Sequence, residues 1–329
     1  MEGIVFIPVA DATQPAEARR VAYRLADEIG FTEAARGKLG IVVTEAATNL
    51  LKHAGGGEII LRCTGPQGLE ILAVDAGPGM RSVAECRRDG YSTAGSPGTG
   101  LGAIGRLSQQ SDIYSIEGKG TVVAAFCESG QAASPLSEVW DIATVGCPLP
   151  GEVVSGDKTA VRETGESMQI MVADGLGHGT LASDAANAAR RAFEATQGTP
   201  LRIVEGIHAA LHSTRGAAVA VAEIAPSQGR VRYCGVGNIA GLIASGENTQ
   251  HMVSMNGIAG HQTIRAREFE YRWNRQSVIV MHSDGISGRW QLSGYAGLAG
   301  RRSSMIAAVL FRDWRKKSDD STVLVGRQK

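Results

Sequence analysis

The stretch MVADGLGHGT, residues 171–180, joins an apolar segment to an acidic residue and two glycine turns. The apolar residues predict a strand, and Asp174 stands where that strand ends. A carboxylate followed by glycines at a strand end lets the backbone approach a cation or a phosphate closely. Because Asp-Gly is also ordinary turn chemistry, this stretch indicates a site only if similar turns accompany it.

Similar acidic turns do occur in the same half of the chain. They are SGD (155–157), HSDGIS (282–287) and SDDST (318–322), which contain Asp157, Asp284 and Asp319. Each can project a carboxylate from a strand edge into one shared site. Oxygen ligands of this kind suit Mg²⁺ or Mn²⁺ rather than zinc.

The residues around these turns predict a second domain, 138–329, in which strands surround two helices. The predicted helices cover 180–197 and 200–212. The predicted strands are a pair around 139–173 and the segments 217–224, 230–237, 239–245, 277–284 and 322–326. This order favours a β-sandwich with helices outside. The preceding segment ESGQAASPLS (128–137) lacks apolar periodicity and predicts a short linker.

The first part of the chain, 1–130, reads as a separate α+β domain. Helices are predicted at 15–30, with Thr13 as N-cap and Gly30 at the end, and from 33 to 53. Strands are predicted at 4–9, 58–63, 69–75 and 121–126, with a flexible loop at 89–100 and a helix at 101–110.

The second of these helices carries an aligned polar face. Glu45, Asn49 and His53 lie four residues apart, and the opposite face is formed by Leu39, Val42, Val43, Ala46 and Leu50. A solvated helix face is the simpler interpretation of such a trio. Two downstream features favour a site instead: Asp75 ends a strand before two glycines, and the run from Gly98 to Gly102 opens a helix whose amides can meet phosphate oxygens.

A dinucleotide-binding motif is an alternative interpretation of this region. Gly100, Gly102 and Gly105 satisfy the G-x-G-x-x-G pattern. That pattern requires an apolar strand immediately before it, whereas YSTAGSPGT (91–99) is a polar loop. The dinucleotide interpretation is therefore rejected, and no Walker-type G-x-x-x-x-G-K-[ST] loop is present either.

Composition excludes several function classes. Acidic and basic side chains balance at 33 each, so no overall field favours nucleic acid or an acidic membrane surface. The five cysteines form no paired metal-ligand spacing, which fits a reducing compartment and predicts a cytoplasmic protein. No stretch reaches the roughly 18 apolar residues that a membrane span needs.

The motifs TEAATNLLKHA (44–54), DAGPGM (75–80) and GTGLGAIGRL (98–107) together resemble the three boxes of the GHKL ATPases, the fold of gyrase, MutL and the histidine kinases. The resemblance implies that Asn49 holds the Mg²⁺ bridging the ATP phosphates, that Asp75 accepts from the adenine amino group, and that Glu45 is the catalytic base. The further nucleotide contacts that it implies are His53, Gly77, Gly79, Gly98, Thr99, Gly100, Leu101 and Gly102. The short lid is most similar to RsbT-like serine kinases and anti-sigma factors.

The acidic turns of the second half, with HSTRGAAVAV (212–221) and CGVGNIAGLI (234–243), resemble the metal-dependent PPM serine/threonine phosphatases, in their stage II sporulation E and RsbX branch. The resemblance implies that Asp174 bridges two metal ions, helped by the Gly175 carbonyl, and that Asp284 and Asp319 each hold one. Asp157 would orient the attacking water. Two divalent ions about 3.5–4 Å apart lower the pKa of a water and neutralise charge during in-line displacement.

For three further residues of the second half, the sequence allows either alternative roles or only a structural one. Arg215 either contacts the substrate phosphate or forms a surface ion pair. His178 is either a general acid toward the leaving serine oxygen or a cap of the following helix. Asn238 is interpreted as structural.

The predicted architecture is therefore a GHKL ATPase α/β sandwich followed by a PPM-type β-sandwich flanked by helices. The two resemblances imply a bifunctional switch that uses ATP, Mg²⁺ and Mn²⁺ to phosphorylate and dephosphorylate serine or threonine. The implied partner is a STAS-type anti-sigma antagonist or a stressosome protein, with a sigma factor as a further candidate. One alternative makes the first domain a non-catalytic, ATP-gated binding module, and another makes the second a phosphatase-like scaffold without activity. Residues 128–137 leave no room for the switch helices of sensor-controlled relatives, so control is expected to be direct.

Overall fold

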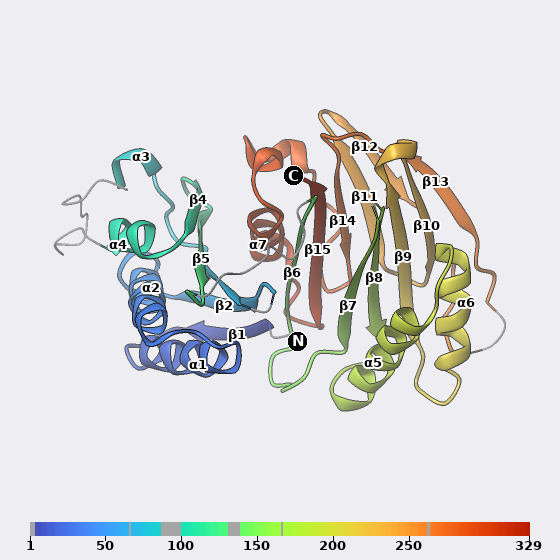
Figure 1. Ribbon diagram of the computed structural model, residues 1–329, viewed down its shortest axis with the longest axis horizontal. Coiled ribbons are helices and arrows are strands. Elements are labelled where there is room, and N and C mark those ends of the chain that lie inside the picture. The colour runs from blue at the N-terminus through green and yellow to red at the C-terminus, as the bar shows by residue number, and fades with distance from the viewer. Residues whose placement is uncertain (1–3, 66, 87–99, 131–138, 166, 262–263) are drawn as a thin grey trace. The chain divides into compact units, whose positions relative to one another are not determined.

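The computed structural model describes residues 4–65, 67–86, 100–130, 139–165, 167–261 and 264–329 of the chain. Backbone contacts divide the chain into two compact units, Met1–Glu138 and Val139–Lys329. Each unit has its own sheets and its own buried apolar core (Figure 1). Among the described residues, no helix is long and apolar enough to cross a membrane.

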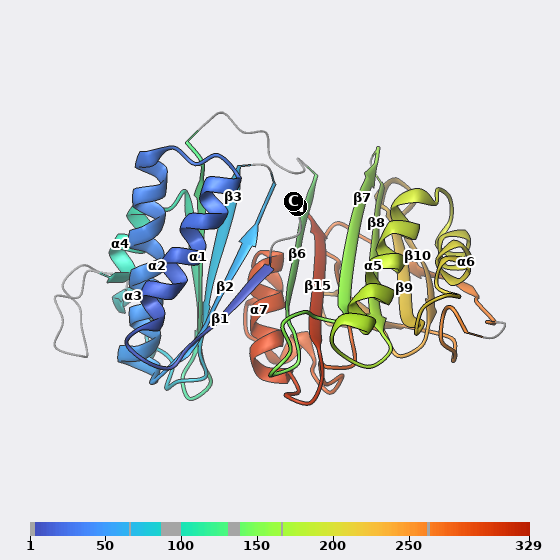
Figure 2. The same cartoon turned by 90° about the horizontal axis from the view of Figure 1, so that it is seen from below.

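The first unit is one antiparallel sheet with helices against one face (Figure 2). The strand order is β1-β2-β3-β5-β4. The strands are β1 (Ile4–Val9), β2 (Gly57–Cys63), β3 (Gly68–Val74), β4 (Gln110–Ile116) and β5 (Gly120–Glu128). The helices are α1 (Gln14–Glu28), α2 (Glu33–Ala54), the short α3 (Val83–Cys86) and α4 (Gly100–Leu107).

Helix α2 confirms the predicted helix at 33–53, and its local signals explain both ends. The Thr32 hydroxyl oxygen accepts from the Ala35 amide at 3.3 Å, and Gly55 ends the helix at a φ of 71°. The predicted apolar face is buried throughout: Leu39, Val42, Val43, Ala46 and Leu50. This burial fixes α2 on the sheet and leaves the face that carries Glu45 and Asn49 partly open.

The start of α1 corrects one expectation. Thr13 occupies the N-cap position, but its side chain makes no capping hydrogen bond. Its hydroxyl instead donates to Asp11 Oδ1 at 2.6 Å, and Gln14 Oε1 accepts from the Asp11 amide at 2.9 Å. The local Asp11 turn therefore replaces the expected Thr13 cap. Gly30, with a φ of 75°, follows the last turn as predicted.

The second unit is a sandwich of two antiparallel sheets, with strand orders β13-β10-β9-β8-β7 and β12-β11-β14-β15-β6. The first sheet consists of β7 (Asp157–Thr164), β8 (Ser167–Gly175), β9 (Ala217–Ala225), β10 (Arg230–Val236) and β13 (Glu268–Arg272). The second consists of β6 (Trp140–Cys147), β11 (Ala240–Ser245), β12 (Asn248–Met252), β14 (Val278–His282) and β15 (Ser321–Gln328). Short 3₁₀ turns occur at Pro226–Gln228, Leu292–Gly294 and Leu298–Gly300.

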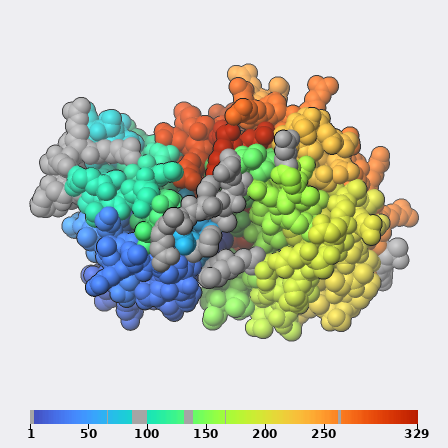
Figure 3. Space-filling view, in the orientation of Figure 1, coloured from blue at the N-terminus to red at the C-terminus, as the bar shows by residue number. Residues whose placement is uncertain are grey.

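Helices cover the outer faces of this sandwich. Helices α5 (Thr180–Ala195) and α6 (Pro200–Ala210) pack on the first sheet, and they form the yellow-green and yellow surface in Figure 3. Helix α7 (Ser303–Trp314) packs on β6 and β15 of the second sheet. The core between the sheets includes Ile170, Val172 and Met281. Because side chains alternate along a strand, Asp174 continues the inward-facing row of Ile170 and Val172 at the edge of the sandwich.

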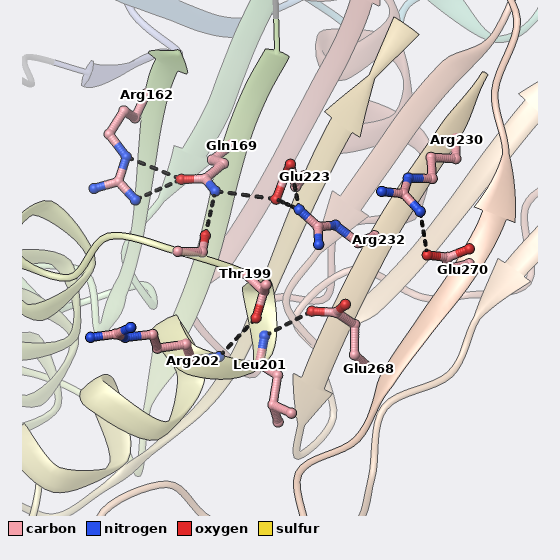
Figure 4. A network of polar contacts seen from close by, with 11 residues as sticks. Arg162, Gln169, Thr199, Leu201, Arg202, Glu223, Arg230, Arg232, Glu268 and Glu270 are labelled. Carbon is pink, nitrogen blue, oxygen red and sulfur yellow. Dashed lines mark hydrogen bonds and ion pairs between the residues drawn. The ribbon is translucent and has the colours of Figure 1, made fainter. Parts of the chain in front are cut away.

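A polar row ties the end of α5 to the first sheet. Arg162, Gln169, Glu223, Arg232 and Glu270 occupy successive paired positions across its five strands (Figure 4). Arg162 Nε donates to Gln169 Oε1 at 3.1 Å, and Arg232 Nη2 donates to Glu223 Oε2 at 2.7 Å. This row therefore anchors one end of the helix layer, while β8 carries Asp174 toward the opposite end.

Several elements of the structure were not predicted, among them the short α3. Strand β4 follows α4 directly, so the helix expected at 101–110 ends at Leu107. The predicted strand pair around 139–173 is three strands, and β12, β13 and α7 were missed. Residues 303–311 of α7 are all buried, so this helix lacks the amphipathic pattern that identifies a surface helix.

Candidate functional site

In the first unit, α2 and the start of α4 bring two of the predicted nucleotide contacts together. A Cβ placed on Gly100 would lie 2.8 Å from Glu45 Oε2 and 3.3 Å from Asn49 Oδ1. The bare backbone of Gly100 therefore lies directly against the polar face of α2. His53 lies two turns along α2 from Glu45 and is exposed, so it does not join this contact.

Asp75 is held at the end of β3 by backbone donors. Its Oδ1 accepts from the amides of Gly77 at 2.8 Å and Thr121 at 3.2 Å. A Cβ on Gly77 would lie 2.6 Å from Ala54 Cβ, and one on Gly79 would lie 2.2 Å from the Ile116 carbonyl oxygen. These glycines therefore let the Asp75 loop pass closely between the end of α2 and the β4–β5 turn. The packing of the chain alone requires glycine at both positions, independently of a nucleotide.

The glycine-rich run at 98–102 is described only in part. Gly98 and Thr99 lie outside the described residues. Gly100, Leu101 and Gly102 form the first turn of α4, and Leu101 packs partly into the apolar core. Among the three described residues of this run, Gly100 is the one placed against Glu45 and Asn49.

In the second unit, the four predicted acidic residues stand at strand ends of both sheets. Asp157 opens β7 and pairs in register with Asp174 near the end of β8. Asp284 follows β14, and Asp319 precedes β15. The two adjoining sheets therefore bring acidic turns together that are far apart in the sequence.

Hydrogen bonds tie these strand ends across the sandwich. Ser283 Oγ donates to Asp157 Oδ2 at 2.6 Å and accepts from the Thr322 amide at 3.0 Å. The buried Asp320 accepts from the amides of Leu149 at 2.8 Å and Gly156 at 3.0 Å. Asp320 thus fixes the loop before Asp157. The sequence, in which Asp319 and Asp320 are adjacent, did not show which of the two has this role.

Electrostatics show that the carboxylates act on one another. Burial, followed by the charges of Asp157, Asp284 and Asp319, raises the pKa of Asp174 to about 9. Burial also raises the pKa of Asp157 to about 7, although the Ser283 hydrogen bond opposes this shift. Burial and Asp284 raise the pKa of Asp319. Such mutual destabilisation of charge favours protons or cations at this site.

The donor chemistry fits divalent cations. All the clustered groups are carboxylates, and the buried Asp157 Oδ1 has no hydrogen-bond partner among the described residues. Magnesium and manganese prefer oxygen ligands of this kind. Among the described residues, no three His, Cys, Asp or Glu side chains lie close enough together to hold one metal ion as they stand. The residues thus supply the oxygen donors, but their positions in the structure do not form a finished coordination shell.

Asn238 and Lys316 support Asp284. Asn238 Nδ2 donates to Asp284 Oδ2 at 2.7 Å, and Lys316 Nζ donates to the Asp284 carbonyl at 2.6 Å. The structural role expected for Asn238 is therefore specific: it orients an acidic residue of the site. The position of Asn238 after a strand in CGVGNIAGLI gave only a weak signal of this role.

The loop after Asp174 carries His178, which was singled out from the sequence, and the partner of His178 is Glu152, which was not. His178 Nδ1 contacts Glu152 Oε1 at 2.6 Å, and Gly179, not His178, is the N-cap residue of α5. The helix-cap interpretation of His178 is therefore wrong, and Glu152 was not identified. A Cβ on Gly177 would lie 3.2 Å from Arg215 Nη1, which places that guanidinium beside the same loop.

Comparison with known families agrees with this division. Residues 9–126 match the histidine kinase-like ATPase domain, and residues 164–328 match the stage II sporulation protein E family. The serine/threonine-protein kinase RsbT of Bacillus subtilis is 33% identical over 111 residues, 33% of this chain and 84% of RsbT.

The second half has relatives of its own. The phosphoserine phosphatase RsbX of Bacillus subtilis is 25% identical over 140 residues, which is 42% of this chain and 70% of RsbX. A crystal structure of RsbX with magnesium superposes with a TM-score of 0.53 at 22% identity, over 59% of this chain and 97% of that one. A chain from a structural study of the bacterial stressosome gives a TM-score of 0.53 at 26% identity, over 57% and 99%.

Proposed function

Because this chain belongs to the stage II sporulation protein E family through residues 164–328 and joins that phosphatase domain to a histidine kinase-like ATPase domain, we propose that it is a bifunctional partner-switching protein. Its first domain transfers phosphate from ATP to serine or threonine of a protein. Its second domain removes such a phosphate. The names of the relatives, a serine/threonine kinase and a phosphoserine phosphatase, support both activities.

One observation carries the phosphatase half of this proposal. The carboxylates of Asp157, Asp174, Asp284 and Asp319 stand at strand ends of two sheets, and the charges of the other three all raise the pKa of Asp174. Asp174, Asp284 and Asp319, with the Gly175 carbonyl, are the residues that would hold Mg²⁺ or Mn²⁺. When bound, these ions supply charge neutralisation at phosphorus and a lowered pKa for the attacking water.

The chain's own residues divide the remaining work. Water attacks phosphorus, the bond between phosphorus and the serine oxygen breaks, and that oxygen takes a proton. His178 is suited to donate this proton because Glu152 contacts its Nδ1 and leaves Nε2 for the leaving group. Arg215, beside the same loop, is suited to neutralise phosphate charge. Asp157 orients the water through its buried Oδ1, which accepts no hydrogen bond from the described residues.

Hydrolysis of 4-nitrophenyl phosphate tests the phosphatase activity. The purified chain is expected to hydrolyse this ester only with Mg²⁺ or Mn²⁺, and Asp284→Asn is expected to abolish the reaction. Asp184→Asn, on the exposed face of α5, is the matched control and should leave the rate unchanged. Hydrolysis that persists in EDTA, or that survives Asp284→Asn, would contradict the proposal.

For the kinase half, we assign Glu45 as the base toward the acceptor hydroxyl, Asn49 as the Mg²⁺ ligand and Asp75 as the adenine contact. Its support is the contact of Gly100 with Glu45 and Asn49. The proposed acceptor is a STAS-type antagonist or a stressosome protein, in line with the RsbT and stressosome relatives. Labelled ATP and a STAS-domain protein should give phosphoserine. An ATP-dependent complex without phosphoserine would instead make this domain a binding module, for example for a sigma factor.

A further inference from the structure

Exposed apolar side chains gather around the carboxylate site of the second unit. Val153 is 93% exposed, Val154 39%, Leu176 45% and Leu181 54%. They come from the loop before β7, the loop after β8 and the first turn of α5. Contiguous exposed apolar side chains are uncommon on soluble proteins and often mark an interaction site. We call these four residues the apolar rim.

Contacts between neighbouring residues hold together the segments that carry the apolar rim. Glu152 contacts His178, and a Cβ on Gly179 would lie 2.9 Å from Glu152 Oε2. A Cβ on Gly156 would lie 2.9 Å both from Ala182 Cβ and from Asp320 Oδ2. Val153 and Val154 lie between Glu152 and Gly156 in sequence, so both ends of their loop are held against the start of α5.

The same contacts join the rim to the acidic site. Leu176 directly follows Gly175, and its amide donates to the Gly216 carbonyl at 3.0 Å, next to Arg215. Leu181 precedes Ala182, whose carbonyl oxygen would lie 2.0 Å from a Cβ on Gly175. The rim therefore borders the strand end that carries Asp174. A phosphoserine that reaches Asp174 brings its neighbouring residues onto these side chains.

We infer that the apolar rim selects the protein substrate: it binds the residues that flank the phosphoserine and favours apolar flanks over polar ones. This inference rests on the proposed phosphatase function and names its substrate class. A small phosphate ester needs only the carboxylates and Arg215, so it has no use for exposed valine and leucine on three surrounding segments. A phosphoserine in a protein segment with apolar neighbours would bury them.

The test compares two phosphoserine peptides of equal length, one with leucine and one with serine on both sides of the phosphoserine. The wild-type chain should cleave the leucine peptide with a kcat/KM about tenfold higher. Val153→Ser combined with Leu181→Ser should remove most of this preference because both changes replace exposed apolar contacts. The rate with 4-nitrophenyl phosphate should not change.

Val253→Ser is the matched control, since Val253 is 49% exposed but lies after β12, away from the rim in sequence. It should keep the preference for the leucine peptide. The Asp284→Asn protein should bind the leucine peptide more tightly than the serine peptide without cleaving either one, as measured by fluorescence anisotropy. Equal cleavage of the two peptides, or an unchanged preference in the rim variant, would overturn the inference while 4-nitrophenyl phosphate hydrolysis upholds the phosphatase. Absence of that hydrolysis would overturn both.

Discussion

At the scale of single residues, the acidic site shows a conflict between stability and function. Asp174 lies inside the sandwich edge beside other carboxylates, and its pKa is raised from 3.8 to about 9, first by burial. The folded protein therefore holds a proton on Asp174 that the unfolded chain releases at much lower pH. Carboxylates that are buried beside one another for cation binding therefore reduce the stability of the cation-free fold.

The first prediction follows from the sign of this shift. Between pH 4 and pH 9 the folded state binds more protons than the unfolded state, so the stability of the cation-free protein falls as pH rises. Asp174→Asn removes this cost. In EDTA, the variant should have a higher melting temperature than the wild type at pH 8 and a similar one near pH 4. Circular dichroism melts across this pH range measure the difference.

The exposed Asp184 supplies the control for this experiment, because Asp184→Asn removes one carboxylate from the same unit without touching the site. Its melting curve should follow that of the wild type at every pH. Asp174→Asn should at the same time lose hydrolysis of 4-nitrophenyl phosphate. A variant that melts below the wild type at pH 8 would show that the Asp174 charge stabilises the fold.

At the scale of elements, the approach of α4 to α2 gives the second prediction. Gly100→Ala places a methyl group 2.8 Å from Glu45 Oε2 and 3.3 Å from Asn49 Oδ1, so these side chains must shift. The affinity for ATP should fall about tenfold, or about 1.4 kcal/mol. Titration with a fluorescent ATP analogue measures it. Gly105→Ala, whose methyl would lie 3.6 Å from Ser111 Oγ, should keep the affinity. Equal affinities for both variants would refute the proposed role of this contact.

The polar row on the first sheet of the second unit gives the third prediction. Arg162 donates to the carbonyls of Phe193 at 2.9 Å and Thr196 at 3.0 Å, and so ties the end of α5 to β7. Arg162→Met keeps the apolar stem but leaves these carbonyls unpaired, and should cost about 2 kcal/mol of unfolding free energy in urea. Arg190→Met, which removes the pair with the exposed Glu194 one turn along α5, should cost less than about 0.5 kcal/mol. Equal costs would mean that the row is not an anchor.

Elements also show how far sequence reasoning reached. Helix α2 and its face with Glu45 and Asn49 were predictable because capping and apolar periodicity are local. Contacts such as Asn238 with Asp284 and Glu152 with His178 were not, since they join residues 46 and 26 positions apart. Only the pairing and packing of the sheets create them. The acidic turns could be read from the sequence, but the side chains that contact them could not.

At the scale of the whole molecule, one chain combines two domains with opposing proposed reactions. A covalent link keeps both near a shared partner, and such a link often gives effective concentrations in the millimolar range. A phosphoprotein released by one domain can then meet the other before it diffuses away. This physical advantage requires that the two reactions use separate residues, and the separate apolar cores of the two units support that requirement.

The last prediction separates the two reactions. With one STAS-domain protein as partner, Asn49→Ala should lose phosphorylation and keep dephosphorylation, because Asn49 belongs to the first unit. Asp319→Asn should show the reverse. Intact-protein mass spectrometry follows phosphate on and off the partner. A mixture of the two variants restores both activities but not the link, so at nanomolar concentrations it should cycle phosphate more slowly than the wild-type chain. Loss of both activities in either variant, or equal cycling by mixture and wild type, would argue against two independent, tethered sites.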